Sequence, residues 1–326
     1  MRRPLEEKVA IVTGASSGVG WQTAQRLAEA GASVCVTARR LEPLQDLCRL
    51  IEFVGGQAHA VACDVTDDAQ VRRVVDECIE RFGHVDVLVN NAAVQAYGYF
   101  DQLEWEVIQR TFDVNAFGPM RFARAVLPHF RQQGSGHIVN VASMLSRGAA
   151  PLLASYGASK HAMLGWSEAL RLELYATGIH VSAVLVPSVA TPMFDHAPTK
   201  FALAPQPVPP TYHPDVAARA VVKVVRRPRA TVVPVFLQGK LPLWTEQWVK
   251  PLTDWLLGRF GARMQMRNQP VNRPEGAMFR PIPDGVGPLG SVRPTPNWKR
   301  WASGAALFGL AGGALGAAGV GGVKLA

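Results

Sequence analysis

The chain carries a tyrosine and a lysine, Tyr156 and Lys160, four positions apart in a stretch with helical periodicity. At this spacing both side chains project from the same face of a helix, about one turn apart. A nearby ammonium stabilises a phenolate and so lowers the pKa of a phenol from its usual value of about 10. Such a pair can pass a proton to or from an alcohol or carbonyl oxygen. The alternative is a surface pair that covers a helix flank and does no chemistry.

Length and composition limit the classes of protein to consider. The 326 residues are 48% hydrophobic, which is enough for one α/β domain with an extension or for two small domains. The net charge of +9 is uneven: residues 1–214 carry 18 Lys+Arg against 20 Asp+Glu, and residues 215–326 carry 16 against 5. The basic part could face an anionic membrane surface. We expect no nucleic-acid partner, because no helix-turn-helix, zinc or RNA-binding signature is present.

The cysteines and the N-terminus point to a reducing compartment. The four cysteines, at positions 35, 48, 63 and 78, form no CxxC motif and have no histidine pairs at metal-binding spacing. We therefore expect small core residues and no metal site. No apolar run precedes Val9, so no signal peptide is predicted.

A glycine-rich turn follows the first apolar run. Residues 9–13 predict a buried strand, and a helical pattern extends to residue 29. Between them, Gly14, Gly18 and Gly20 follow a GxxxGxG spacing. Backbone N–H groups in such a turn, with the positive end of the helix, can approach a pyrophosphate. A tight turn without a ligand is the alternative, but the position after the first strand of a βαβ unit favours a dinucleotide.

Two arginines follow the second predicted strand, residues 33–37. NAD-binding proteins of this architecture usually place an acidic residue there for the ribose 2′-hydroxyl. Here Ala38 is followed by Arg39 and Arg40, which can form charge-assisted bonds to a 2′-phosphate. A solvated charged turn is the alternative. We interpret the site as preferring NADP(H).

Strand and helix patterns alternate along the rest of the first 240 residues. Further strands are predicted at 58–62, 85–89, 137–142, 180–186 and 230–236, and helices at 41–53, 69–82, 102–131, 155–175 and 214–225. The alternation predicts an α/β fold, a Rossmann-like doubly wound parallel sheet with ligands at the carboxyl ends of its strands. Asp64, Asn90 and Ser143 fall at such ends.

The long predicted helix contains Pro119, which has no N–H for the carbonyl of Asn115 four residues earlier. The helix should kink there and free that backbone acceptor for water or a side chain. Asn in the middle of a helix is unfavourable without a compensating role. A kink without a function is the alternative.

Taken together, these residues resemble the short-chain dehydrogenase/reductase family over roughly residues 5–240. The resemblance rests on the order and spacing of the Thr13–Gly20 loop, Asp64, the Asn90-Asn91-Ala92 run, Asn115, Ser143, the Tyr156/Lys160 pair, and Pro187 with Thr191. It implies hydride transfer between a nicotinamide and a carbonyl or alcohol.

The resemblance also implies roles for single residues. Tyr156 is expected to be the general acid/base, and Lys160 to lower its pKa and hold the nicotinamide ribose. Ser143 is expected to bond the substrate oxygen, and Asn115 to position a water that connects Lys160 to solvent. Of the cofactor residues, Asp64 is assigned to adenine, Asn90 to the adenosine side and Thr191 to the carboxamide. The complete predicted cofactor set is Gly14, Ser16, Ser17, Gly18, Val19, Gly20, Arg39, Arg40, Asp64, Val65, Asn90, Ala92, Tyr156, Lys160, Pro187, Val189 and Thr191.

Two positions depart from the family pattern. Ala93 and Ser188 stand where the family usually has glycine. A side chain there restricts the backbone near the cofactor. Neither change removes a chemical group, so we expect an effect on cofactor affinity rather than on activity.

Residues 241–301 are predicted to extend the domain formed by residues 1–240. The segment 241–260 places Trp244, Trp248, Leu252 and Leu256 along one helical face, interrupted by Pro251. It could cover the core as a lid or lie on a bilayer. Residues 261–301 are rich in Pro and Arg without periodicity and predict a loosely ordered linker.

Residues 302–323 are 22 uncharged residues flanked by Trp298, Trp301 and basic side chains. As a helix they would span ~33 Å, enough for a hydrocarbon core. The small-xxx-small spacing of their glycines is typical of packed membrane helices. A flexible Gly/Ala tail is the alternative. With more basic charge before the segment than after it, a C-terminal anchor places the enzyme on the cytoplasmic side of a membrane; otherwise the protein is soluble in the cytoplasm.

The leading hypothesis is thus an NADP(H)-dependent oxidoreductase acting on the carbonyl or alcohol group of a small hydrophobic substrate. Its apolar lid is predicted in the Pro-rich loop with Phe194, Phe201 and Leu203. One alternative is a dinucleotide-binding scaffold or redox sensor without turnover, and another is an NAD-linked dehydrogenase of the same fold. A homo-oligomer is expected by analogy with the family.

Overall fold

Short apolar runs build a parallel sheet at the centre of the molecule. The computed structural model describes residues 5–235, 251, 253–271 and 275–296. The sheet has seven strands in the order β3-β2-β1-β4-β5-β6-β8, and every neighbouring pair is parallel. The strands are β1 (Val9–Thr13), β2 (Ser33–Ala38), β3 (Gln57–Ala62), β4 (Val87–Asn90), β5 (Gly136–Ser143), β6 (Ile179–Val186) and β8 (Thr231–Val232). The predicted Rossmann-like parallel sheet is confirmed.

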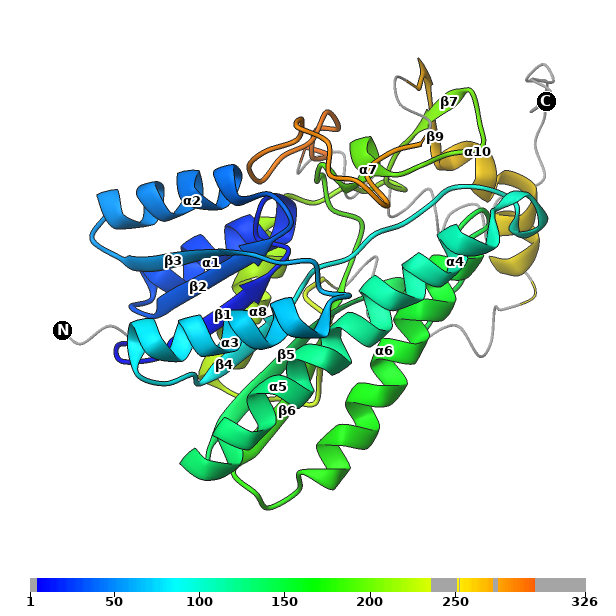
Figure 1. Ribbon diagram of the computed structural model, residues 1–326. Helices are drawn as coiled ribbons and strands as arrows, with labels where there is room; N and C mark the ends of the chain where they lie inside the picture. Colours follow the sequence, from blue (N-terminus) through cyan, green and yellow to red (C-terminus); the bar gives the residue numbers. More distant parts are fainter. Residues whose placement is uncertain (1–4, 236–250, 252, 272–274, 297–326) are drawn as a thin grey trace.

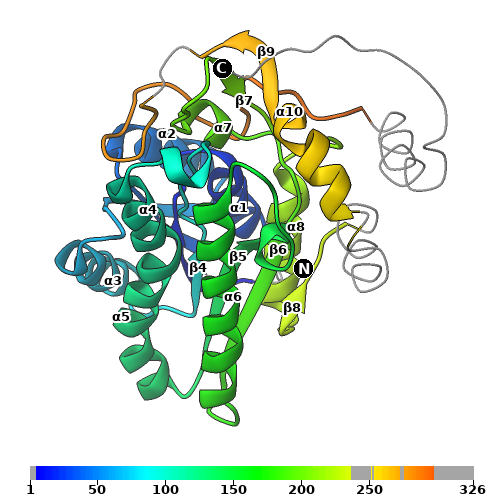
Figure 2. The same cartoon turned by 90° about the vertical axis from the view of Figure 1, so that its right-hand side faces the viewer.

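Helices cover both faces of the sheet, as Figures 1 and 2 show. One face carries α1 (Gly18–Glu29), α2 (Leu41–Phe53) and α8 (Asp215–Arg226), and the other carries α3 (Asp68–Phe82), α4 (Trp105–Phe112), α5 (Gly118–Gln133) and α6 (Ala154–Glu173). Side chains of β1 alternate between the two cores: Ala10 and Val12 pack with α1 and α2, while Val9 and Ile11 pack with α3 and α5. A sheet buried on both faces explains the almost uninterrupted apolar runs of its strands.

The long helix predicted at 102–131 is divided by a π-helical turn. After a short 3₁₀ turn, η1 (Phe100–Gln102), the helix begins as α4, passes through η2 (Asp113–Phe117) and continues as α5. The Gly118 N–H bonds to the Asp113 carbonyl, five residues back. Pro119 occupies the first turn of α5, so its missing N–H falls where the π turn interrupts the regular ladder. The predicted kink therefore takes the form of a π-bulge, a feature frequent at functional sites.

The described C-terminal residues pack on the rim of the sheet. A two-stranded antiparallel sheet joins β7 (Leu203–Pro205) to β9 (Met266–Pro270). The π-helical η5 (Leu257–Gly261) and α10 (Ala262–Met264) precede β9 in the chain, and β7 lies beside α7 (Met193–His196). Figures 1 and 2 show residues 275–296 continuing over the carboxyl end of the parallel sheet.

The segment 261–301 thus differs from the predicted loose linker where the structure describes it. Periodicity could not indicate this order, because β-pairing and backbone hydrogen bonds to distant loops hold the segment. Of the predicted amphipathic segment, Trp244, Trp248 and Leu252 lie outside the described residues, as do residues 302–323. Within the described part of the chain, no helix combines the length and the apolar character needed to cross a membrane.

Candidate active site

Ser143, Tyr156 and Lys160 meet at the carboxyl end of β5. Ser143 is the last residue of β5, and its Oγ accepts a hydrogen bond from the Leu145 N–H at the start of the 3₁₀ turn η3 (Met144–Ser146). Tyr156 and Lys160 lie in the first half of α6, where both are buried. The Tyr156 hydroxyl is hydrogen-bonded to the Ser143 hydroxyl. The three residues predicted from sequence therefore form one cluster.

The ionisation of this cluster differs from the sequence-based expectation. Burial raises the pKa of Tyr156 to about 12, although the Ser143 hydrogen bond acts in the opposite direction. Burial also lowers the pKa of Lys160 to about 8. The Lys160 Nζ lies 5.9 Å from the centroid of the Tyr156 ring and donates to the Val141 carbonyl at 3.0 Å. Burial thus moves the pKa of Tyr156 upward, opposite to the direction predicted from the neighbouring ammonium.

Asn115 connects the π turn to the helix α6, which bears Tyr156 and Lys160. Its Oδ1 accepts from the Val94 N–H at 2.8 Å, and its Nδ2 donates to the Val94 carbonyl at 2.8 Å and to Ser159 Oγ at 3.0 Å. Ser159 Oγ in turn donates to the Tyr156 carbonyl at 2.7 Å. The fully buried side chain thus joins the loop after β4 to the turn of α6 that bears Tyr156.

The glycine loop is held close to β4 by its lack of side chains. A Cβ on Gly14 would stand 2.7 Å from the Cα of Ala92, and one on Gly20 would stand 2.4 Å from the Gly14 carbonyl. Asn91 completes the junction, with its Nδ2 donating to the Thr13 carbonyl at 2.9 Å. The motif spacing therefore allows the loop to approach the neighbouring strand directly.

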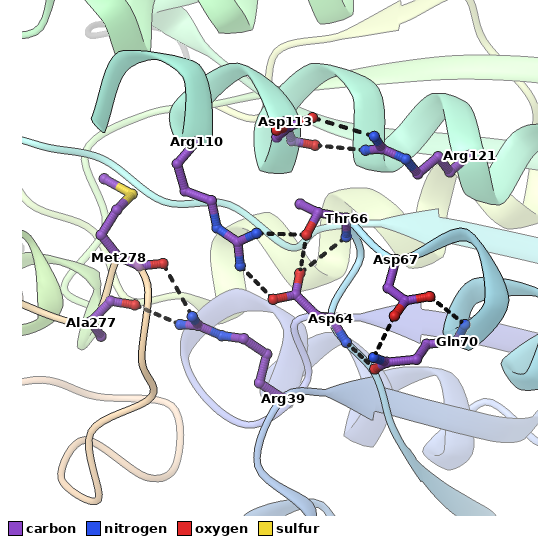
Figure 3. Close-up of polar contacts among 10 residues, drawn as sticks. All are labelled: Arg39, Asp64, Thr66, Asp67, Gln70, Arg110, Asp113, Arg121, Ala277 and Met278. Carbon is purple, nitrogen blue, oxygen red and sulfur yellow. Dashed lines mark hydrogen bonds and ion pairs between the residues drawn. The ribbon is translucent and has the colours of Figure 1, made fainter. Parts of the chain in front are cut away.

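Charged residues gather at the carboxyl ends of β2 and β3. Asp64 forms an ion pair with Arg110 of α4 and accepts a bond from the Thr66 N–H at 3.0 Å (Figure 3). These bonds lower the pKa of Asp64 although burial opposes them. Arg39 and Arg40 line the same region, and burial lowers the pKa of both guanidinium groups. No sequence motif indicated Arg110, because its pairing with Asp64 joins α4 to the loop after β3, 46 residues earlier in the chain.

A single cavity of about 590 Å³ connects this charged region to the catalytic cluster. Its volume is typical of sites for small molecules and cofactors. Most predicted site residues line it: Gly14, Ser16, Ser17, Gly18, Val19, Arg39, Arg40, Asp64, Val65, Ala92, Ser143, Tyr156, Lys160, Pro187, Val189 and Thr191. Ala93 and Ser188 also reach its wall. Gly20, Asn90 and Asn115 do not; the Asn90 Nδ2 instead donates to Asn140 Oδ1 on β5 at 2.9 Å.

The catalytic end of the cavity is largely apolar. Tyr97, Leu153, Phe194 and Leu257 line it, and the predicted lid residues Phe201 and Leu203 pack behind Tyr156 in the same hydrophobic cluster. Gln95 adds a polar group that the sequence did not indicate: its buried amide lowers the pKa of Tyr97 as a hydrogen-bond donor, against the larger opposite effect of burial, and its Nε2 has no closer partner among the described residues. Among the described residues, no group of His, Cys, Asp and Glu could hold a metal ion.

Comparison with known proteins identifies related sequences. The model of the short chain dehydrogenases matches residues 8–200. An uncharacterized oxidoreductase of Bacillus subtilis is 32% identical over 284 residues, covering 85% of this chain and 79% of its own. A fatty acyl-CoA reductase of Acinetobacter baylyi is 35% identical over 233 residues, covering 70% of this chain and 76% of its own.

Solved structures agree with the sequence relatives. A metagenomic short-chain oxidoreductase in complex with NADP has a TM-score of 0.60 and 28% identity, covering 71% of this chain and 97% of its own. A variant of actinorhodin polyketide ketoreductase with NADPH has a TM-score of 0.64 and 30% identity, covering 72% of this chain and 97% of its own. The parallel sheet, the glycine loop and the cluster of Ser143, Tyr156 and Lys160 therefore have one explanation: the chain belongs to the short-chain dehydrogenase/reductase family.

Proposed function

We propose that the protein is an NADP(H)-dependent oxidoreductase that reduces the carbonyl group of a hydrophobic substrate. The observation that carries the proposal is the single cavity with arginines at one end and the Ser143–Tyr156 pair at the other. Its lining joins the glycine loop, the two arginines and the Ser143–Tyr156 pair, which suits a dinucleotide followed by a substrate. The relatives named as reductases and the neighbours crystallised with NADP or NADPH support the same reading.

The residues of the wall divide into groups by the part of the cofactor that they suit. The loop from Gly14 to Val19 suits the pyrophosphate through its backbone N–H groups, apart from that of Gly18, which donates to the Gly287 carbonyl. Arg39 and Arg40 suit the 2′-phosphate, and Asp64 and Val65 flank the adenine. The nicotinamide end is assigned to Ala92, Tyr156, Lys160, Pro187, Val189 and Thr191.

The catalytic cluster supplies a proton. When bound, NADPH supplies the hydride for the carbonyl carbon. Tyr156, protonated at neutral pH because burial raises its pKa to about 12, donates its phenolic proton to the carbonyl oxygen, and an alcohol forms. The Ser143 hydroxyl holds that oxygen beside the phenol. Lys160 stabilises the phenolate that remains until a proton returns from solvent.

The lining near Tyr156 favours an apolar substrate. Leu153, Phe194 and Leu257 offer no charged partner, while the Gln95 amide can donate to one further oxygen. NADPH consumption should therefore be measured with ketones and acyl thioesters of increasing chain length, each paired with a charged analogue of equal size. Turnover that rises with apolar length supports the proposal. NADPH binding without turnover on the whole panel would favour the scaffold hypothesis.

Membrane attachment is a separate proposal that rests on composition alone. Residues 302–323 have the length and the flanking aromatic residues of an anchor. Full-length protein and protein ending at Asn297 should be compared in membrane and soluble fractions. Equal partitioning of the two would remove the anchor from the proposal and leave the catalytic part unchanged.

A further inference from the structure

A segment near the C-terminus runs along the outer wall of the charged end of the cavity. We call residues 275–291 the strap. Its backbone is docked at both ends: the Ala277 N–H donates to the His196 carbonyl at 2.7 Å, and the Gly18 N–H of α1 donates to the Gly287 carbonyl at 2.8 Å. Figure 1 shows the strap beside α7 and above the ends of β1 and β2. Residues of the strap thus reach the glycine loop from a distance of more than 250 positions in sequence.

The strap provides carbonyl partners for the two arginines that follow β2. Arg39 donates from Nη2 to the Ala277 carbonyl at 2.6 Å and from Nη1 to the Met278 carbonyl at 3.1 Å, as Figure 3 shows. Arg40 donates to a row of carbonyls farther along the strap, at 2.8 to 3.4 Å: Ile282, Pro283, Asp284 and Gly285. Neither guanidinium could hold one fixed position on the protein surface without such partners, because the side chain of a free arginine has about 2 kcal/mol of rotamer entropy to lose.

These carbonyl bonds orient the arginines without neutralising them. A carbonyl is a neutral acceptor, and among the described residues neither Arg39 nor Arg40 forms an ion pair. Asp64, whose charge acts on Arg39, is paired with Arg110, and the charge of Asp284 acts on Arg40. Three guanidinium groups therefore face two carboxylates in a partly buried region. The remaining positive charge favours an anion at the wall of the cavity.

The arginines also keep donors for that anion. A guanidinium carries five N–H groups, and the bonds of Arg39 to the strap use one on each terminal nitrogen. Both arginines line the cavity together with Ala277, Met278 and Ile282 of the strap. A phosphate binds such preoriented guanidinium groups through charge-assisted hydrogen bonds. The entropy of ordering the two side chains is then lost on folding and not on binding.

We propose that the strap positions Arg39 and Arg40 for the 2′-phosphate of NADP(H), so that its docking sets the preference for NADP(H) over NAD(H). The inference rests on the proposed function, which supplies the cofactor. The strap carbonyls act as positioning groups that do not contact the phosphate themselves. A dinucleotide without the phosphate gains nothing from oriented arginines, so we expect its affinity to depend on the strap much less, through the bond to Gly18 and the shared cavity wall.

Two glycines bring the strap close to His196, so a side chain at either position should loosen the docking. A Cβ on Gly285 would stand 2.2 Å from His196 Nε2, and a Cβ on Gly276 would stand 2.3 Å from the His196 carbonyl; both glycines have positive φ. Gly285→Ala and Gly276→Ala should each displace the strap. Val286→Ala is the matched control, because this neighbouring side chain is exposed. Arg39→Asp serves as the reference variant, because it should abolish the preference for NADPH over NADH.

The dissociation constants of NADPH and NADH should be measured for each protein, with circular dichroism to confirm the fold. We expect each glycine variant to raise the NADPH constant about tenfold, equivalent to 1.4 kcal/mol, and the NADH constant less than twofold. Val286→Ala should leave both unchanged. Equal losses for the two cofactors would overturn the proposal and make the strap a general cover, and tighter NADPH binding would overturn it by showing competition. Wild-type protein that does not bind NADPH would instead remove the proposed function.

Discussion

The Lys160 ammonium donates a hydrogen bond to the Val141 carbonyl at 3.0 Å, which joins α6 to β5 two residues before Ser143. The bond fixes the lysine beside the phenol of Tyr156 while the surrounding core removes it from water. Burial lowers the pKa of Lys160 from 10.5 to about 8 and raises that of Tyr156 from 10.0 to about 12. Burial thus moves the pKa of the lysine down and that of the tyrosine up, and such environment-driven shifts are common for acid–base pairs in active sites.

The pH dependence of reduction should follow Lys160. Below about pH 8 the lysine is charged and Tyr156 is protonated, which is the arrangement that donates a proton. Above about pH 8 the ammonium loses its proton first, so kcat/KM for carbonyl reduction should fall while the phenol is still protonated. A pH profile of kcat/KM from 6 to 10 measures this. An unchanged rate up to pH 10 would show that the charge on Lys160 is not required.

Tyr156→Phe should remove the proton donor and keep the shape of the cavity. We expect kcat to fall by about 10²–10⁴-fold, the usual contribution of general acid–base catalysis. Tyr97→Phe is the matched control, because Tyr97 is a second buried phenol in the same cavity wall. NADPH consumption measures both variants. Full activity in Tyr156→Phe, or equal losses in the two variants, would contradict the assigned role.

Much of this site could be predicted because local sequence determines it. The glycine spacing requires the close approach of the loop to Ala92, and the positions of Ser143 and Tyr156 follow from the end of a strand and the face of a helix. The π turn at Asn115 was predictable as a kink from Pro119, although not as a π-bulge. In each case the physical cause lies within a few residues of its effect.

The parts that sequence could not supply depend on distant contacts. Arg110 of α4 pairs with Asp64 in the loop after β3, 46 residues earlier, and the strap carbonyls pair with Arg39 and Arg40, more than 230 residues earlier. Such bonds leave no periodicity. The pKa of Tyr156 was expected to fall beside Lys160, but it rises, because the sequence shows the neighbouring charge and not the depth of burial.

Asn115→Ala should reduce both stability and activity. The change removes bonds to Val94 and Ser159 in a fully buried place and leaves their polar groups unpaired. We expect a loss of about 1–3 kcal/mol in the free energy of unfolding, measured with urea. Asp113→Ala, in the same π turn but with a half-exposed carboxylate, should change stability much less. If Asn115→Ala is as stable as the wild type, the hydrogen bonds of Asn115 to Val94 and Ser159 do not stabilise the junction between the π turn and α6.

Arg110→Gln should weaken NADPH binding through the charge at the adenosine end of the cavity. The substitution frees Asp64, whose carboxylate then faces Arg39 without its partner on α4 and offsets the charge meant for the phosphate. We expect the dissociation constant of NADPH to rise severalfold. The rise should be larger at low salt than at high salt, because salt screens the charge of the freed carboxylate. Arg121→Gln is the matched control: Arg121 pairs with Asp113 on the same helical run and does not line the cavity (Figure 3). If both variants weaken NADPH equally at all salt concentrations, the effect comes from the helix rather than from the charge beside Asp64.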